Sequence, residues 1–250
     1  MIPDESAKAI FSHCENILQN YWENNLLGPS QFYRGITTNL WKDSYTANCE
    51  RHMLIFQTNN VIPEYCFNCY KILVEPRDVL ELFKLMIIFN GIQLPNNNTR
   101  KCMVETRAEI SGTYKGLVYS QNLEEAKGML LSLREIISKE ISPEITISLK
   151  RGCTEYAISY PEYTEFDDEN IPTMQYRPEW RDYEKAADEN GLAEHCPPIL
   201  VDNINPKGYT LGDAKVMLNW LKYAATIEDV SYLKIASKPI SKLKGLVTRS

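Results

Sequence analysis

The sequence predicts an α+β protein with a ferredoxin-like core, that is, a split βαβ arrangement. Three observations predict this fold class. Apolar residues alternate in short β-rich segments, apolar residues recur at helical spacing between those segments, and the elements follow the order β-α-β-β-α-β across residues 70–150. Short connections and a right-handed crossover would place both helices on one face of an antiparallel sheet.

The first half of this core reads as a strand, a helix and a second strand. Residues 70–75 alternate, with apolar side chains on one face and charged side chains on the other. Pro76 opens a helical segment that ends near Gly91, since glycine accepts the left-handed conformation just past a helix end. Residues 101–107 form the second predicted strand.

The second half continues with a strand, a helix and a last strand. Residues 113–119 form the third predicted strand. Asn122, with Glu125 three residues later, is typical of a helix N-terminus because the amide side chain accepts a hydrogen bond from the first turn. After this helix, residues 145–150 form the fourth strand.

Helical segments flank the core. Residues 4–24 and 210–225 carry apolar stripes at helical spacing, whereas residues 26–48 show no period and are expected to be mostly loop. Residues 162–190 combine acids, prolines and aromatics, which favours an extension on the surface over a disordered linker. The predicted division is an N-terminal helix and metal-knuckle arm (1–65), the α+β core (66–160), and an acidic, aromatic-rich extension with C-terminal helices packed on the core (161–250).

Composition and charge argue against several classes of function. The chain has 250 residues and a formal net charge of −6, whereas a protein that coats nucleic acid or an anionic membrane needs a basic surface. We find no secretion signal and no apolar run near the roughly 18 residues of a membrane helix. The seven cysteines are therefore expected to be reduced, buried or metal-bound in a cytoplasmic protein with no membrane partner.

The strongest motif consists of two pairs of metal-binding residue types. Cys49 and His52 are followed by Cys66 and Cys69 with the spacing C-x2-H-x13-C-x2-C. Each pair is expected to form a tight turn that aims both members at one ion, and the intervening segment can fold back as a hairpin or turn. Thiolate and imidazole suit tetrahedral Zn²⁺, and four donors describe a closed structural site. The predicted role is to clamp the N-terminal arm onto the first core strand, with an iron–sulfur cluster as the alternative group.

Other interpretations of these cysteines stay open. The four residues can be unrelated buried side chains, because free cysteine is common in protein cores. Cys66 and Cys69 can form a redox pair, although that motif normally begins a helix and here it precedes a strand. Cys153 is a plain thiol or a reserve ligand in place of His52, because its strand is expected beside the first one. Cys102 is expected to lie two strand spacings away, too far to share the ion with Cys69.

The third predicted strand resembles the start of the RNP1 segment of the RNA recognition motif. The resemblance covers the stretch Lys115-Gly116-Leu117-Val118-Tyr119 and the element order. It implies that bases stack on aromatic side chains of the central strands. Leu117 stands where that family has an aromatic residue, which puts the stacking in doubt. The candidate phosphate contacts under this hypothesis are Lys71, Lys101, Arg107, Lys115, Lys150 and Arg151.

No catalytic motif can be read from the sequence. We therefore expect a non-catalytic, metal-stabilised binding or assembly protein, with a protein partner docked on the aromatic extension. One alternative is an enzyme of unrecognised class with a site between the sheet and the C-terminal helices, for example with Cys153 and His195 as a nucleophile pair. The other alternative is a nucleic-acid-associated protein that uses the open face of the sheet.

Overall fold

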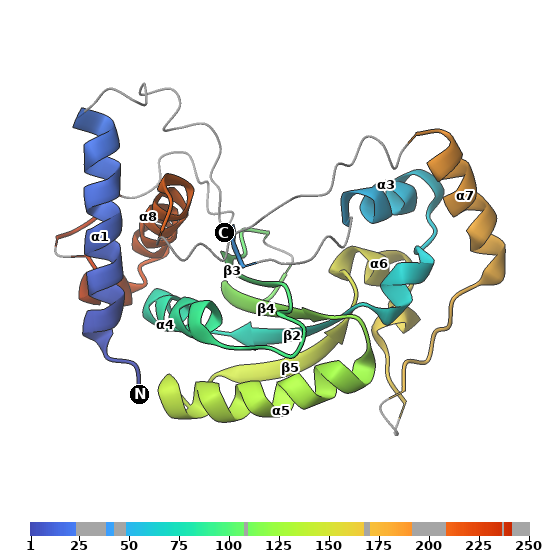
Figure 1. Cartoon of the computed structure of the whole chain (residues 1–250), viewed down its shortest axis with the longest axis horizontal. Coiled ribbons are helices and arrows are strands. Elements are labelled where there is room, and N and C mark those ends of the chain that lie inside the picture. The colour runs from blue at the N-terminus through green and yellow to red at the C-terminus, as the bar shows by residue number, and fades with distance from the viewer. Residues whose placement is uncertain are drawn as a thin grey trace.

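The protein is an α+β molecule in which helices surround one antiparallel sheet (Figure 1). Its structure is a computed structural model. The model describes residues 1–23, 39–42, 49–107, 110–167, 171–191, 209–236 and 238–241. The α+β class predicted from the sequence is therefore confirmed.

Within the described residues the sheet has five strands, which are β1 (Asn39–Lys42), β2 (Tyr70–Glu75), β3 (Arg100–Val104), β4 (Tyr114–Ser120) and β5 (Thr146–Arg151). Their spatial order is β1-β3-β4-β2-β5, and every neighbouring pair is antiparallel. β2 to β5 correspond to the four predicted strands, but β3 ends at Val104 rather than at residue 107. Beyond it, the side chain of Glu105 accepts hydrogen bonds from both the backbone and the guanidinium of Arg107. β1 lies in the predicted loop, because a four-residue strand is too short to show an alternating pattern.

Two helices connect the strands and pack against the sheet. α4 (Val79–Gly91) joins β2 to β3, and α5 (Leu123–Glu140) joins β4 to β5. Asn122 caps α5 as predicted, since its side chain accepts a hydrogen bond from the Glu125 amide at 2.8 Å. Gly116 on β4 lets α4 approach closely, because a Cβ atom there would collide with side chains of that helix.

The main core lies between the sheet and these two helices and continues into α1 (Asp4–Glu23) and α8 (Leu211–Thr226). Figure 1 shows α1 and α8 side by side, on the same side of the molecule as α4. Phe83 of α4 joins these three helices. Its ring meets Phe11 of α1 and Trp220 of α8 edge to face, with centroid distances of 6.5 and 5.7 Å. η4 (Val230–Lys234) follows α8 and is capped by Asp229, whose side chain accepts a hydrogen bond from the Ser231 amide at 3.0 Å.

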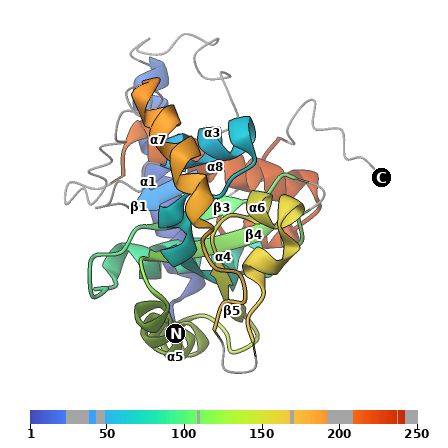
Figure 2. The ribbon, with the colours of Figure 1, turned by 90° about the vertical axis from the view of Figure 1, so that its right-hand side faces the viewer.

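A second set of buried residues, the aromatic cluster, lies at the other end of the molecule (Figures 1 and 2). It is built from short elements, which are α3 (Cys49–Asn59), η1 (Glu64–Asn68), α6 (Thr154–Ser159), η2 (Pro161–Thr164), η3 (Pro178–Trp180) and α7 (Arg181–Glu189). The buried residues of the aromatic cluster are Ile55, Val61, Ile62, Cys66, Phe67, Tyr156, Tyr163, Met174, Trp180 and Ala187.

The side chain of Arg151, at the end of β5, holds the aromatic cluster together. It is 3% exposed and donates hydrogen bonds to the backbone carbonyls of Phe67 and Met174. Its guanidinium also lies 4.8 Å from the Phe67 ring centre and 5.0 Å from that of Tyr163. One buried cation therefore ties the end of the sheet to η1 and to the segment after β5.

Candidate metal centre

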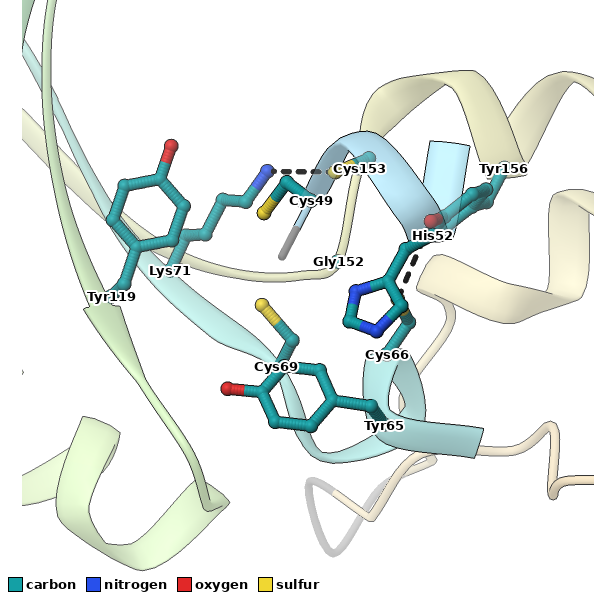
Figure 3. A pocket seen from close by; sticks show the side chains of 10 residues that line it. All are labelled: Cys49, His52, Tyr65, Cys66, Cys69, Lys71, Tyr119, Gly152, Cys153 and Tyr156. Carbon is teal, nitrogen blue, oxygen red and sulfur yellow. Dashed lines mark hydrogen bonds between the residues drawn. The ribbon is translucent and has the colours of Figure 1, made fainter. Parts of the chain in front are cut away.

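The four residues of the predicted metal site line one small cavity beside the aromatic cluster (Figure 3). Its volume is about 20 Å³, which is enough for about one water molecule or one ion. The cysteine cavity, as we call it, is lined by Cys49, His52, Tyr65, Cys66, Cys69, Lys71, Tyr119, Gly152, Cys153 and Tyr156.

Cys49 and His52 are presented by the first turn of α3. Residues three positions apart lie on the same side of a helix, so both side chains reach the cavity. The sequence suggested a tight turn followed by a hairpin, whereas the chain forms a helix that continues to Asn59. The His52 ring stacks on Tyr65, with centroids 5.0 Å apart and planes inclined by 20°. This contact fixes the imidazole as one wall of the cavity.

Cys66 and Cys69 come from η1 and the residue that ends it. The turn is closed by a hydrogen bond from the Cys69 amide to the Cys66 carbonyl at 3.2 Å. The Cys66 sulfur lies 3.3 Å from the Tyr156 hydroxyl. Cys69 directly precedes β2, so the sheet fixes its position.

Cys153 is the fifth sulfur or nitrogen donor on the cavity. The strand register pairs Tyr70 with Arg151, and the next amide, that of Gly152, donates a hydrogen bond to the Cys69 carbonyl at 2.8 Å. Cys153 therefore lies beside Cys69, as the predicted strand order implied. The Lys71 Nζ donates a hydrogen bond to the Cys153 sulfur at 3.4 Å and lies 5.4 Å from the centre of the Tyr119 ring.

Helix α7 fixes the two segments that carry the predicted ligands. Arg51, which lies between Cys49 and His52 in the sequence, donates hydrogen bonds of 2.6 and 2.7 Å to the carboxylate of Asp188. Glu184, one turn earlier, accepts a hydrogen bond from the Glu64 amide at the start of η1. The acidic extension thus contributes to the site by holding its walls.

Burial dominates the electrostatics of the cavity. It lowers the pKa of His52 to about 4, so the imidazole is neutral near pH 7 and has a lone pair available. Burial raises the pKa of Cys69 to about 12, with the nearby Lys71 acting in the opposite direction. It also raises the pKa of Cys66 well above its ordinary value. These thiols are protonated unless a cation displaces their protons.

Burial acts to lower the pKa of two lysines beside the cavity, but their neighbouring groups give them opposite net shifts. Burial alone would lower the pKa of Lys71, but the neighbouring Cys153 and Tyr119 outweigh it and raise the pKa overall. Burial lowers the pKa of Lys101 to about 8, and the positive charge of Lys71 adds to that effect. The two ammonium groups are therefore close enough to repel each other, at the edge of a group of sulfur atoms.

The donor types fit a soft or borderline cation such as Zn²⁺, which prefers thiolate and imidazole ligands. In the part of the chain that the structure describes, no three His, Cys, Asp or Glu side chains are already placed to hold a metal ion. A bound cation would therefore have to draw the sulfur atoms inward from their present positions.

The remaining sequence candidates lie elsewhere or are already engaged. Cys102 is buried in the main core, whereas His195 lies outside the described residues. Of the proposed phosphate contacts, Arg151 is buried in the aromatic cluster, and Arg107 pairs with Glu105 and Glu155. Lys115 lies within 3.9 Å of Glu105 and is itself buried. Lys150 remains exposed on β5.

The fold and the cavity define a mixed α+β protein with a cysteine-rich cavity at one end of an antiparallel sheet. Comparison with known proteins found no matching family model, no matching curated protein and no matching solved structure. Each helix in the described ranges is too short or too polar to cross a membrane.

Proposed function

We propose that this chain is a non-catalytic binding or assembly protein whose cysteine cavity holds one structural metal ion. Zn²⁺ is the first candidate and an iron–sulfur cluster the second, with Cys49, His52, Cys66 and Cys69 as the donors that the sequence singles out. One observation carries the proposal. These donors come from two separate elements, α3 and the end of η1, and still line a single cavity of ionic size.

The proposed role of the ion is mechanical. α3 and η1 are short elements that pack in the aromatic cluster and are held by hydrogen bonds to α7. An ion shared by both elements would attach α3 to η1 and, through Cys69, to the start of β2. Structural zinc contributes on the order of 10 kcal/mol in isolated small domains. In this larger protein it would reinforce one end and not the whole fold.

We also infer that the core has the split βαβ, ferredoxin-like topology. The strand order β3-β4-β2-β5, its antiparallel pairing and the two connecting helices support this assignment. The proposed protein partner would then bind at the α3–α7 end. Ile158 on α6 and Tyr183 on α7 are exposed, at 79% and 50%.

Metal content tests the proposed function. Purified full-length protein, reconstituted with Zn²⁺ under reducing conditions and desalted, is expected to retain one zinc per chain by elemental analysis. Cys69→Ala should lose that zinc, and a chelator should lower the melting temperature of the unmodified protein but not that of the variant. The matched control is Cys102→Ala, which removes a buried thiol from the main core and should keep the metal. Unmodified protein that binds neither zinc nor iron would contradict the proposal.

A further inference from the structure

The cysteine cavity carries five sulfur or nitrogen donors, one more than a tetrahedral ion can use. Cys49, Cys66, Cys69 and Cys153 supply sulfur, and His52 supplies nitrogen. If the proposed function is right, one of the five is left out of the coordination shell. Which one is excluded decides the charge of the metal centre, and the structure bears on the choice.

Cys153 is the donor outside the four residues of the spacing motif, and the β2–β5 strand pair fixes its position. Its neighbour Gly152 continues the β2–β5 ladder through the hydrogen bond to the Cys69 carbonyl. Gly152 has a φ of +54°, and this left-handed turn leads the chain out of the strand and into α6. Figure 3 shows the sulfur atoms of Cys49, Cys69 and Cys153 directed toward the same space.

His52, in contrast, has a structural role that needs no metal. Its ring is stacked on Tyr65 and is 6% exposed, so it fills one wall of the cavity. Its backbone neighbour Arg51 is held by α7, which sets the orientation of this turn. Any flat aromatic side chain at position 52 could make the same stacking contact, so the packing of His52 does not depend on its nitrogen atoms.

Two cations lie where a thiolate-rich centre would need them. Zn²⁺ with four thiolates carries two net negative charges, and burying such a charge without compensation is costly. Lys71 donates to the Cys153 sulfur, and Lys101 follows on β3, on the same face of the sheet, two residues along in register. Lys71 offsets part of the charge of four thiolates through its hydrogen bond to Cys153, and Lys101 adds a second positive charge on the same face of the sheet.

We propose that Cys49, Cys66, Cys69 and Cys153 form a four-thiolate metal site, that His52 stays outside the coordination shell, and that Lys71 compensates the thiolate charge through Cys153. This inference rests on the proposed metal-binding function and revises its ligand set, because Cys153 takes the place of His52. Each thiol that binds releases its proton to solvent, so the cation replaces four protons and no oxidant or reductant is involved.

X-ray absorption of the zinc-loaded, unmodified protein tests the ligand set without any substitution. The expected spectrum has a single shell of four sulfur atoms at about 2.3 Å. A nitrogen scatterer at about 2.0–2.1 Å beside three sulfurs would overturn the inference and leave the proposed function standing. A protein that takes up no metal would instead contradict the proposed function itself, so the two failures are distinguishable.

A pair of variants gives the same answer by another route. His52→Phe keeps a ring to stack on Tyr65 but removes the nitrogen donors, and it should still bind one zinc with four sulfur neighbours. Cys153→Ala should lose the zinc or bind it at least about tenfold more weakly in competition with a chelator. Loss of zinc from His52→Phe, or unchanged affinity in Cys153→Ala, would overturn the four-thiolate assignment.

The role of Lys71 is tested through its charge. Lys71→Met should weaken zinc binding by about 10- to 100-fold, as removal of an outer-shell partner does in other metal sites. Lys71→Arg should restore most of the affinity because it keeps the positive charge. The control is Lys150→Met, which removes an exposed lysine that pairs with Lys71 in the strand register. Equal affinities for Lys71→Met and Lys150→Met would contradict the charge-compensating role.

Discussion

The two buried regions of this protein are built in different ways. The main core is formed by long helices whose apolar stripes pack on a sheet, and most of its members are aliphatic. The aromatic cluster is formed by short helices and 3₁₀ turns, and rings in edge-to-face contact fill its centre. Each region has a buried arginine, Arg100 beside the main core and Arg151 in the aromatic cluster, whereas the cysteine cavity lies against the second region.

This difference shows two ways to stabilise a region of a protein. Long regular elements bury large apolar areas, at roughly 25 cal/mol per Å², and need no specific partner. Short irregular elements bury less surface and leave backbone groups unpaired, so they depend on directed contacts. Here those contacts are the hydrogen bonds of Arg151, the ion pair between Arg51 and Asp188 and, in our proposal, a metal ion.

The largest expected effect comes from the main core. Phe83→Ala removes the ring that joins α1, α4 and α8, and it should lower the free energy of unfolding by about 3–5 kcal/mol. Denaturant unfolding should give the same loss with and without a chelator, because the proposed metal site lies at the other end of the molecule. Leu131→Ala, at a residue that is 67% exposed on α5, is the control and should change stability by less than about 0.5 kcal/mol. A loss for Phe83→Ala that vanishes in the chelated protein would show that the two regions are coupled.

A smaller but more selective effect is expected at the turn that leads to Cys153. Gly152→Ala places a Cβ against the Tyr163 ring at a positive φ, and that ring is held by its hydrogen bond to the Cys66 carbonyl. The free energy of unfolding should fall by about 2 kcal/mol or more, and zinc retention should fall with it. Gly128→Ala is the matched control. It lies in α5 with open space around it and should stabilise the protein by about 0.5–1 kcal/mol. Full zinc retention in Gly152→Ala would contradict the link between this turn and the metal site.

The smallest expected effect concerns the attachment of α1 to the main core. A hydrogen bond from Lys84, at 2.6 Å, lowers the pKa of Asp4 below its ordinary value of 3.8, and Lys234 adds to this. Because the folded pKa is depressed, the stabilisation is present above that ordinary value and is lost as the pH falls through the folded pKa. Asp4→Asn should therefore cost under about 1 kcal/mol at pH 7, since the carboxylate is partly exposed, and nothing at low pH. Asp182→Asn, at an exposed position on α7, is the control, and a cost for Asp4→Asn that persists unchanged at low pH would contradict the ion-pair explanation.

Sequence patterns identified the regular half of the fold well. β2 and α4 lie where alternation and helical spacing indicated, α8 lies within the predicted helix 210–225 apart from its last residue, and the side chain of Asn122 caps α5. The same approach missed α3, α6 and α7. α6 has only six residues, and α7 has nine, most of them polar. The composition of the extension predicts that its aromatic residues bind a partner, whereas Tyr163 and Trp180 are buried inside the protein.

For the candidate site, spacing alone identified four of the five donors on the cavity, because the two pairs of metal-binding residue types each lie within four residues of the sequence. Spacing indicates Cys153 only as a substitute for His52, since Cys153 comes 84 positions after Cys69 and reaches it through strand pairing. Lys71 and Gly152 could not be found this way at all. One was a candidate for phosphate contacts, and the other carried no motif.

The amino-acid sequence by itself determined the α+β class, the regular elements of the core and the residue types able to bind a cation. These follow from local chemistry, namely side-chain periodicity, helix capping and ligand preference, which act over a few residues. Only the tertiary structure decided that the β5–α6 turn brings a fifth donor, Cys153, to the cavity beside Lys71 of β2. Such contacts depend on strand order and register across distant segments, and no local pattern encodes them.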